Sequence, residues 1–230
     1  MIRKLHNMNK QNGVSLMEVL ISLSISLVVT ASMVALMANS LANTARIIKM
    51  TKLSDDMRMA LQMMSRDVRR SSYNANSMLC YANDDCGNDG AVTLPGDIVI
   101  NAGEDCFTFL TDRDHDGDST ENSAGGFRRV TVDGVGVIEM WTGDATPNCA
   151  AAAGTANWIR VTDPGDTDIF AFGVDDDLSY TVQILNDGAG NTLSQKVRKI
   201  RMNMGGRLVM DNNIERRIED IIAVRNDLLL

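Results

Sequence analysis

The sequence predicts an α+β fold in which one long N-terminal helix packs on an antiparallel β-sheet head. Neither glycine nor proline occurs between Val14 and Asp85, so no helix-breaking residue interrupts this stretch. Beyond Tyr73 the chain changes to short β-rich runs separated by turn residues. Consecutive strands at short spacing favour an antiparallel sheet, and one face of such a sheet can cover an amphipathic helix.

Residues 1–38 have the composition of a membrane segment behind a basic leader. The leader, 1–13, carries Arg3, Lys4 and Lys10 and no acidic side chain. Residues 14–38 are mostly apolar, and about 20 such residues span a bilayer as a helix. Positive charge on the short N-terminal side places that end in the cytoplasm and the rest of the chain outside it. The one charge in the apolar run is Glu18. A carboxylate there costs roughly 2.5 kcal/mol or more and usually has a functional partner.

Residues 39–72 are predicted to continue the helix with one apolar face. Apolar side chains recur there mostly at three- or four-residue steps, which places them on one side of a helix. They are Leu41, Ala45, Ile48, Leu53, Met57, Ala60, Leu61, Met64 and Val68. A helix from Val14 to about Arg70 would be roughly 85 Å long. We interpret Met57, Met59, Met63 and Met64 as core filling, because methionine adapts to irregular gaps.

Residues 73–230 are expected to form a β-rich globular head. Asp133-Gly134 lies between two apolar runs and is a hairpin turn signal. Further turns are predicted at 186–191 and at Gly205-Gly206. Ile200, Met202 and Met204 alternate with polar residues, as in a strand with one buried face. The predicted strands are 97–100, 106–110, 127–133, 135–141, 157–161, 168–172, 178–185, 196–204 and 214–224.

Charge and composition disfavour two classes of function. The 230 residues carry a formal net charge of −8, and loss of the leader, with its three positive charges, makes it −11. An acidic body repels phosphates, so no nucleic acid partner is expected. The only histidines are His6 in the leader and His115 in an acidic loop, without a nucleophile motif or a glycine-rich phosphate loop. The sequence therefore does not predict an enzyme.

All four cysteines, Cys80, Cys86, Cys106 and Cys149, follow the apolar segment. An even number on the exported side is consistent with disulfides in an oxidising compartment, and three connectivities exist. We favour Cys80–Cys86, which closes a small loop, together with Cys106–Cys149. The longer loop would give the larger stabilisation, about 3–4 kcal/mol. A metal site is the alternative, but the sequence has no C-x-x-C pair.

An acidic loop is a candidate calcium site. Asp112, Asp114, Asp116 and Asp118 place carboxylates at every second position, with Gly117 for a sharp turn. These residues match the first positions of an EF-hand loop, but Ser123 stands where the bidentate glutamate belongs. The alternative is a solvated acidic loop between strands, and no other cofactor is expected. A second acidic turn, Asp175-Asp176-Asp177, is either solubilising or faces a basic patch on a neighbouring subunit.

The stretch Gly13-Val14-Ser15-Leu16-Met17-Glu18 resembles the prepilin signature of type IV pilins and type II secretion pseudopilins. The resemblance implies cleavage after Gly13 by a prepilin peptidase and N-methylation of the new terminus, Val14. It also implies that Glu18, then the fifth residue, acts in assembly. The family usually begins the mature chain with phenylalanine, whereas this sequence has Val14. A pilin-like architecture follows from the resemblance, with the protruding half of the helix buried among those of other subunits.

The run Arg66-Asp67-Val68-Arg69-Arg70-Ser71-Ser72-Tyr73 is similar to the end of the helix in PilW-type minor pilins. The resemblance implies a minor pilin that helps to initiate or cap a type IV pilus. Its partners would be other minor pilins, the major pilin and the inner-membrane assembly platform. The subunit would first lie in the inner membrane with its head in the periplasm, and later at the pilus tip or base on the cell surface.

Two alternatives stay open. Within the same class, the chain would be a J-type pseudopilin of a type II secretion system. In another class, it would be a periplasmic binding or enzymatic domain on a signal anchor. An ordinary signal peptide has an apolar run of roughly 7–15 residues, shorter than this one, yet Ala38-Asn39-Ser40 would pass as a cleavage site. Cleavage after Gly13 indicates a pilin, whereas cleavage after Ser40 or none indicates the other class.

Overall fold

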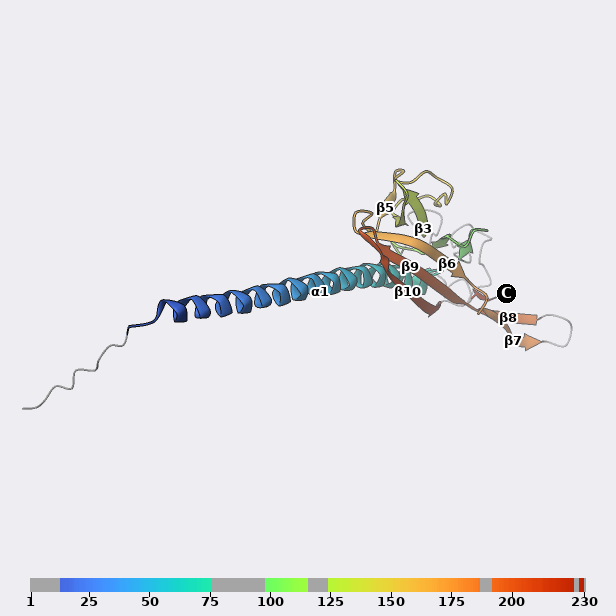
Figure 1. The fold of residues 1–230 in the computed structure, drawn as a ribbon. Helices are drawn as coiled ribbons and strands as arrows, with labels where there is room; N and C mark the ends of the chain where they lie inside the picture. Colours follow the sequence, from blue (N-terminus) through green and yellow to red (C-terminus); the bar gives the residue numbers. More distant parts are fainter. Residues whose placement is uncertain (1–12, 76–97, 116–123, 187–191, 226–227, 230) are drawn as a thin grey trace, which may run out of the picture. The chain divides into compact units, whose positions relative to one another are not determined.

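The computed structural model describes residues 13–75, 98–115, 124–186, 192–225 and 228–229 (Figure 1). Helix α1, Leu16–Arg70, is a single uninterrupted element. The chain divides into two units, Met1–Ile48 and Lys49–Leu230, and the second contains all the strands. A long N-terminal helix followed by antiparallel sheets confirms the predicted α+β fold.

The strands of the described residues form three antiparallel sheets. The five-stranded sheet has the order β1-β2-β3-β4-β5, and two three-stranded sheets have the orders β10-β9-β6 and β11-β8-β7. The bounds of the first five strands are β1 Val99–Ile100, β2 Cys106–Leu110, β3 Ala124–Val132, β4 Val135–Trp141 and β5 Trp158–Arg160. The others are β6 Thr167–Asp175, β7 Tyr180–Asn186, β8 Thr192–Val197, β9 Lys199–Leu208, β10 Asp211–Ala223 and β11 Leu228–Leu229.

The turn between β3 and β4 is the predicted hairpin. Asp133 and Gly134 have φ angles of 51° and 84°, the positive values that a two-residue type I′ turn requires. Val132 pairs with Val135 directly beside the turn. This turn fixes the register of the whole hairpin, because every later pair lies at equal distances from it.

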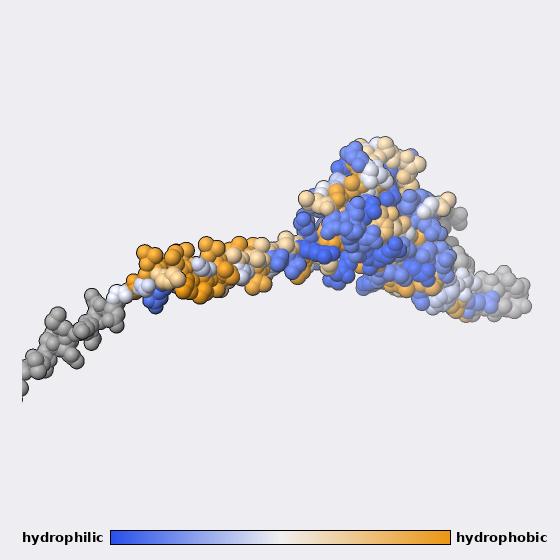
Figure 2. Space-filling model, in the orientation of Figure 1, coloured by the Kyte–Doolittle hydropathy of each residue, from blue (hydrophilic) through white to orange (hydrophobic). Residues whose placement is uncertain are grey.

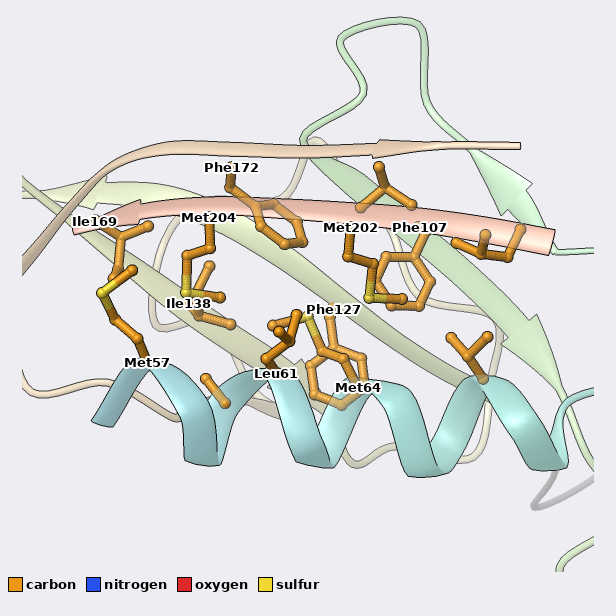
Figure 3. Close-up of a cluster of buried hydrophobic side chains, with 14 of the residues drawn as sticks. Met57, Leu61, Met64, Phe107, Phe127, Ile138, Ile169, Phe172, Met202 and Met204 are labelled. Carbon is orange, nitrogen blue, oxygen red and sulfur yellow. The ribbon is translucent and has the colours of Figure 1, made fainter. Parts of the chain in front are cut away.

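The head is built around one face of the second half of α1. Leu53, Met57, Met64 and Val68 are fully buried, and Leu61 is nearly so. In Figure 3, the α1 side chains Met57, Leu61 and Met64 lie opposite Met202 and Met204 of β9, with aromatic side chains of β2, β3 and β6 beside them. Methionine on both sides suits this interface, since a flexible thioether fills the irregular space between a helix and a twisted sheet. The predicted alternation of Ile200, Met202 and Met204 is confirmed, since all three are buried.

Several predictions within the head were wrong in detail. Gly205 and Gly206 are not a turn but lie inside β9, paired with β6 on one side and β10 on the other. A Cβ on Gly206 would come within 2.7 Å of the Met57 sulfur, so glycine serves close packing of α1 there. The predicted strand 196–204 is two strands, β8 and β9, separated at the buried Arg198. Met59 is 47% exposed and does not fill the core.

Residues 13–48, the described part of the first unit, have no core of their own. Their apolar side chains from Leu16 to Ile48 are exposed, including Leu41 and Ile48, which the periodicity had placed on the packed face. Figure 2 shows hydrophobic residues over this part of α1, while hydrophilic residues predominate on the visible face of the head. A helix that is apolar nearly all round is normally buried in a membrane or among other helices.

Candidate functional site

The candidate cleavage bond lies ahead of the helix. Residues 13–15 are irregular, and α1 begins at Leu16. The carbonyl of Ser15 accepts hydrogen bonds from the backbone N–H groups of Glu18 at 3.0 Å and Val19 at 3.2 Å. Gly13 and Val14 are exposed, and a Cβ added to Gly13 would touch nothing within 4 Å. The Gly13–Val14 peptide bond is therefore open to another protein.

Glu18 lies in the first turn of α1 and is exposed. A negative charge there is favourable because the first N–H groups of a helix carry partial positive charge. Among the described residues Glu18 forms no ion pair. Large apolar side chains surround it in sequence, with Leu16 79% exposed and Met17 68% exposed. This surface offers one carboxylate for a cationic partner in otherwise apolar surroundings.

Four hydroxyls in the apolar half of α1 are satisfied within the helix. The hydroxyls of Ser22, Ser24, Thr30 and Ser32 donate to backbone carbonyls three or four residues earlier, at 2.6–3.1 Å. A buried hydroxyl without a partner would cost about 1–3 kcal/mol, so these bonds make the segment compatible with an apolar environment. The most apolar 18-residue window has a mean hydropathy of 2.4, and none of it is buried by the rest of the chain. By length and composition this helix can cross a membrane.

A disulfide and a buried ion pair fix the loop that follows β4. Cys106 and Cys149 are joined, with 6.0 Å between their Cα atoms. Arg128 and Glu139 are 1% and 0% exposed, and the Arg128 Nη2 lies 2.8 Å from the Glu139 Oε2. The same guanidinium donates to the carbonyl oxygens of Cys149, Ala151 and Ala152. Cys80 and Cys86, the other expected pair, lie outside the described residues.

Sequence reasoning missed this buried pair, although a signal was present. Arg128 and Glu139 each stand five residues from the Asp133-Gly134 turn, and they are direct partners across the β3–β4 hairpin. The other carboxylate oxygen of Glu139, Oε1, accepts a hydrogen bond from the Gly154 N–H at 2.8 Å. The Trp158 ring lies 4.1 Å below the guanidinium carbon, which adds a cation–π contact. This cluster is structural, because the Arg128 guanidinium and both Glu139 oxygens are satisfied within the head.

The acidic loop is only partly described. Asp116 and Asp118 lie outside the described residues. Asp112 is fully buried, and its two oxygens accept the backbone N–H groups of Ala75 at 2.9 Å and His115 at 2.8 Å. Asp114 is exposed. In the described part of the chain no group of three or more His, Cys, Asp or Glu side chains is placed to hold a metal ion. Asp112 instead joins Ala75, which follows α1, to the loop that follows β2.

Two of the three aspartates in the second acidic turn form ion pairs within the head. Asp175 lies 3.5 Å from the Arg201 Nη1, and Asp176 lies 3.9 Å from the Lys196 Nζ. Both ion pairs are partly exposed and contribute little to stability. The pairing partners lie on β8 and β9 of the same head, which reduces the charge available to a neighbouring subunit.

Comparison with known proteins gives two matches. Residues 46–224 match the model of the family described as prepilin peptidase-dependent protein B. Residues 8–34 match the model of the prokaryotic N-terminal methylation motif, which covers Gly13, Val14 and Glu18. No curated protein and no solved structure gave a significant match. The two family matches together cover the candidate cleavage bond, most of the apolar half of α1 and nearly all of the described head.

Proposed function

Because the chain belongs to the family of prepilin peptidase-dependent protein B, we propose that it is a minor pilin that helps to initiate or cap a type IV pilus. We assign 1–13 to the leader, 14–38 to the membrane half of α1, 39–72 to its amphipathic half and 73–230 to the head. The peptidase would cut after Gly13, and Val14 would be the methylated N-terminus. The observation that carries the proposal is Glu18, an exposed carboxylate in the first turn of an exposed apolar helix that bears an N-terminal methylation motif.

The proposed mechanism is the pairing of charges during assembly. Cleavage after Gly13 creates an α-amino group with an ordinary pKa of about 7.7–8.0, which is largely protonated at neutral pH. The Glu18 carboxylate of one subunit pairs with the amino terminus of a neighbour inside a bundle of apolar helices. Each charge then offsets the burial cost of the other, and the pair sets the axial register of the two subunits. Before assembly, Glu18 stays at the cytoplasmic headgroup level.

The proposed location follows from the same steps. The subunit first spans the inner membrane once, with its head in the periplasm, and then enters the base or tip of the filament. Its partners are the prepilin peptidase, the inner-membrane assembly platform, other minor pilins and the major pilin. A structural and not an enzymatic role is part of this proposal, and membership of a prepilin peptidase-dependent family supports it.

The test is incorporation into filaments in a strain that lacks the chromosomal copy of the gene. Glu18→Ala should be cleaved at a normal rate and should accumulate in the membrane, with the filament fraction reduced at least about tenfold, the loss expected for an unpaired buried charge. Ser22→Ala, one turn further along α1, is the matched control and should assemble normally. Normal assembly of Glu18→Ala would contradict the proposed role of this carboxylate.

The J-type pseudopilin is distinguished by the machine that needs the chain. Deletion of a minor pilin gene should reduce surface pili and leave protein secretion unchanged. Loss of secretion with normal piliation would instead assign the chain to a type II secretion system.

A further inference from the structure

Three clefts meet at the end of α1. Their volumes are about 390, 430 and 300 Å³, and Arg70 lines all three. Arg69 and Arg225 both line the second and third clefts. Arg66 lines the first and second, and Arg113 lines the first. We call this continuous surface the arginine groove: Arg66, Arg69, Arg70, Arg113 and Arg225. All five side chains belong to exposed residues.

The backbone that carries the groove is held firmly. The hydroxyl of Thr111 donates to the Arg70 carbonyl at 3.1 Å, and the Ser72 N–H donates to the Leu110 carbonyl at 2.8 Å. Ser72 has a φ of 59°, the left-handed conformation that commonly ends a helix. These bonds tie the last turn of α1 to the end of β2. The backbone that carries Arg69, Arg70 and Arg113 is therefore pre-formed.

The groove has an excess of positive charge. Its five arginines face two aspartates in the three clefts, Asp67 and Asp220. Asp67 lies 3.2 Å from Arg66, and Asp220 accepts a hydrogen bond from Ser65 at 3.3 Å. Among the described residues no carboxylate pairs with Arg69, Arg70, Arg113 or Arg225. Arg113 donates to the Ala124 carbonyl at 2.8 Å. Four neighbouring guanidinium groups without a carboxylate partner in the described part of the chain are unusual in a protein whose net charge is −8.

Helix electrostatics account for only part of this charge. Cations in the last turn of a helix are stabilised by about 0.3–1 kcal/mol, which covers Arg69 and Arg70. Arg113 follows β2 and Arg225 follows β10, so the helix end does not explain them. Their convergence from three parts of the chain indicates a site for an anionic group.

We propose that the arginine groove binds an acidic, carboxylate-bearing segment of a neighbouring subunit. A guanidinium holds a carboxylate through two parallel hydrogen bonds, and several of them in a line suit an extended chain of Asp or Glu residues. Tyr73, which is 38% exposed, and His115 line the third cleft and stack edge-on with 5.6 Å between their ring centroids. They offer a hydroxyl and a ring nitrogen to the same segment.

This inference rests on the proposed function, because assembly holds a neighbour close enough for a weak groove to be filled at high effective concentration. A carboxylate segment fits the observations better than a nucleic acid. The net charge of −8 repels a long polyanion. Each cleft also has a volume of a few hundred Å³, the size that accepts side chains.

The test measures binding of a fluorescein-labelled hexaglutamate peptide to the full chain in non-ionic detergent, by fluorescence anisotropy. The double variant Arg69→Gln/Arg225→Gln should bind at least about tenfold more weakly, since two charge-assisted contacts are lost. Arg160→Gln/Arg216→Gln removes the same charge from exposed residues of β5 and β10 and should bind like the wild type. Affinity should fall as salt rises from about 50 to about 200 mM.

Three results would overturn the inference. One is absence of binding by the wild type, and another is an equal loss in the control variant. The third is tighter binding of a single-stranded DNA oligonucleotide with six phosphates through the same arginines, which would make the groove a nucleic acid site. Arg69→Lys/Arg225→Lys guards against a purely structural effect: it should keep the melting temperature and bind with an affinity between those of the wild type and the glutamine variant, because lysine keeps the charge but not the two parallel hydrogen bonds. Cleavage after Gly13 should be normal in every variant, so failure of the groove leaves the proposed function standing.

Discussion

Removing the Glu139 carboxylate should destabilise the head by about 3 kcal/mol. Loss of one partner from a buried ion pair costs about 3–5 kcal/mol, because an uncompensated charge stays behind. Glu139 is 0% exposed and accepts from two nitrogens of Arg128 and from the Gly154 N–H. In Glu139→Ala, Arg128 keeps the carbonyl acceptors of the 149–152 loop. Because these acceptors partly compensate the remaining charge, we expect a loss of stability at the lower end of the range of about 3–5 kcal/mol.

The assay is urea unfolding of the full chain in detergent, followed by tryptophan fluorescence. Both tryptophans of the sequence lie in this cluster: the Trp158 ring is 4.1 Å from the Arg128 guanidinium carbon and 5.3 Å from the Trp141 ring. The signal therefore reports unfolding of the head and not of the membrane half of α1. The two units of the chain need not unfold together, and tryptophan fluorescence follows the unfolding of the head alone.

Two controls sharpen this prediction. Glu215→Ala removes an exposed carboxylate on β10 and should change the free energy of unfolding by no more than about 0.5 kcal/mol. Arg128→Met/Glu139→Leu removes both charges and should recover part of the loss, since an apolar pair leaves no buried charge. A loss below about 1 kcal/mol for Glu139→Ala would refute the reasoning, because it would mean that water reaches Arg128.

Three further predictions concern the head. Cys149→Ala should cost about 4 kcal/mol of unfolding free energy, because the Cys106–Cys149 bond spans 43 residues; equal urea midpoints with and without reductant would contradict this. Gly136→Ala should cost about 1–3 kcal/mol, since its Cβ would lie 2.0 Å from the Ile169 carbonyl oxygen and force the backbone apart; an unchanged midpoint would contradict that contact. The hydrogen bond and charge of Asp166 raise the pKa of Lys52 above its ordinary value of 10.5. Lys52→Met should therefore be less stable than the wild type at neutral pH, and this difference should vanish as pH rises past the folded-state pKa of Lys52. A difference that persists at high pH would show that the ion pair is not its cause.

Local patterns in the sequence predicted most of the elements, and the packed face of α1 from Leu53 to Val68. The absence of glycine and proline predicts the helix, the Asp133-Gly134 pair predicts the β3–β4 turn, and the alternation in β9 predicts its buried side. The error at Gly205-Gly206 has a physical cause. Adjacent glycines usually indicate a turn, but here they make room for Met57 and Phe170 against a central strand. The local sequence does not show that side chains so far away along the chain pack against these glycines.

The candidate site was also predictable only in part from the sequence. Gly13, Val14 and Glu18 are adjacent in sequence, so their spacing is readable without a structure. The division of the head into three sheets depends on pairings between distant strands, such as β6 with β9. The arginine groove likewise joins the run Arg66–Arg70 to Arg113 and Arg225, which lie far apart in the sequence. No local pattern predicts such a convergence.

The most direct test of the central claim is the N-terminal residue of the mature protein, determined by mass spectrometry from cells with and without prepilin peptidase. The account predicts a chain that starts at Val14, with or without a methyl group, only in cells that contain the peptidase. An intact Met1 in both strains would contradict this prediction, and so would a start at Leu41 in cells with and without the peptidase.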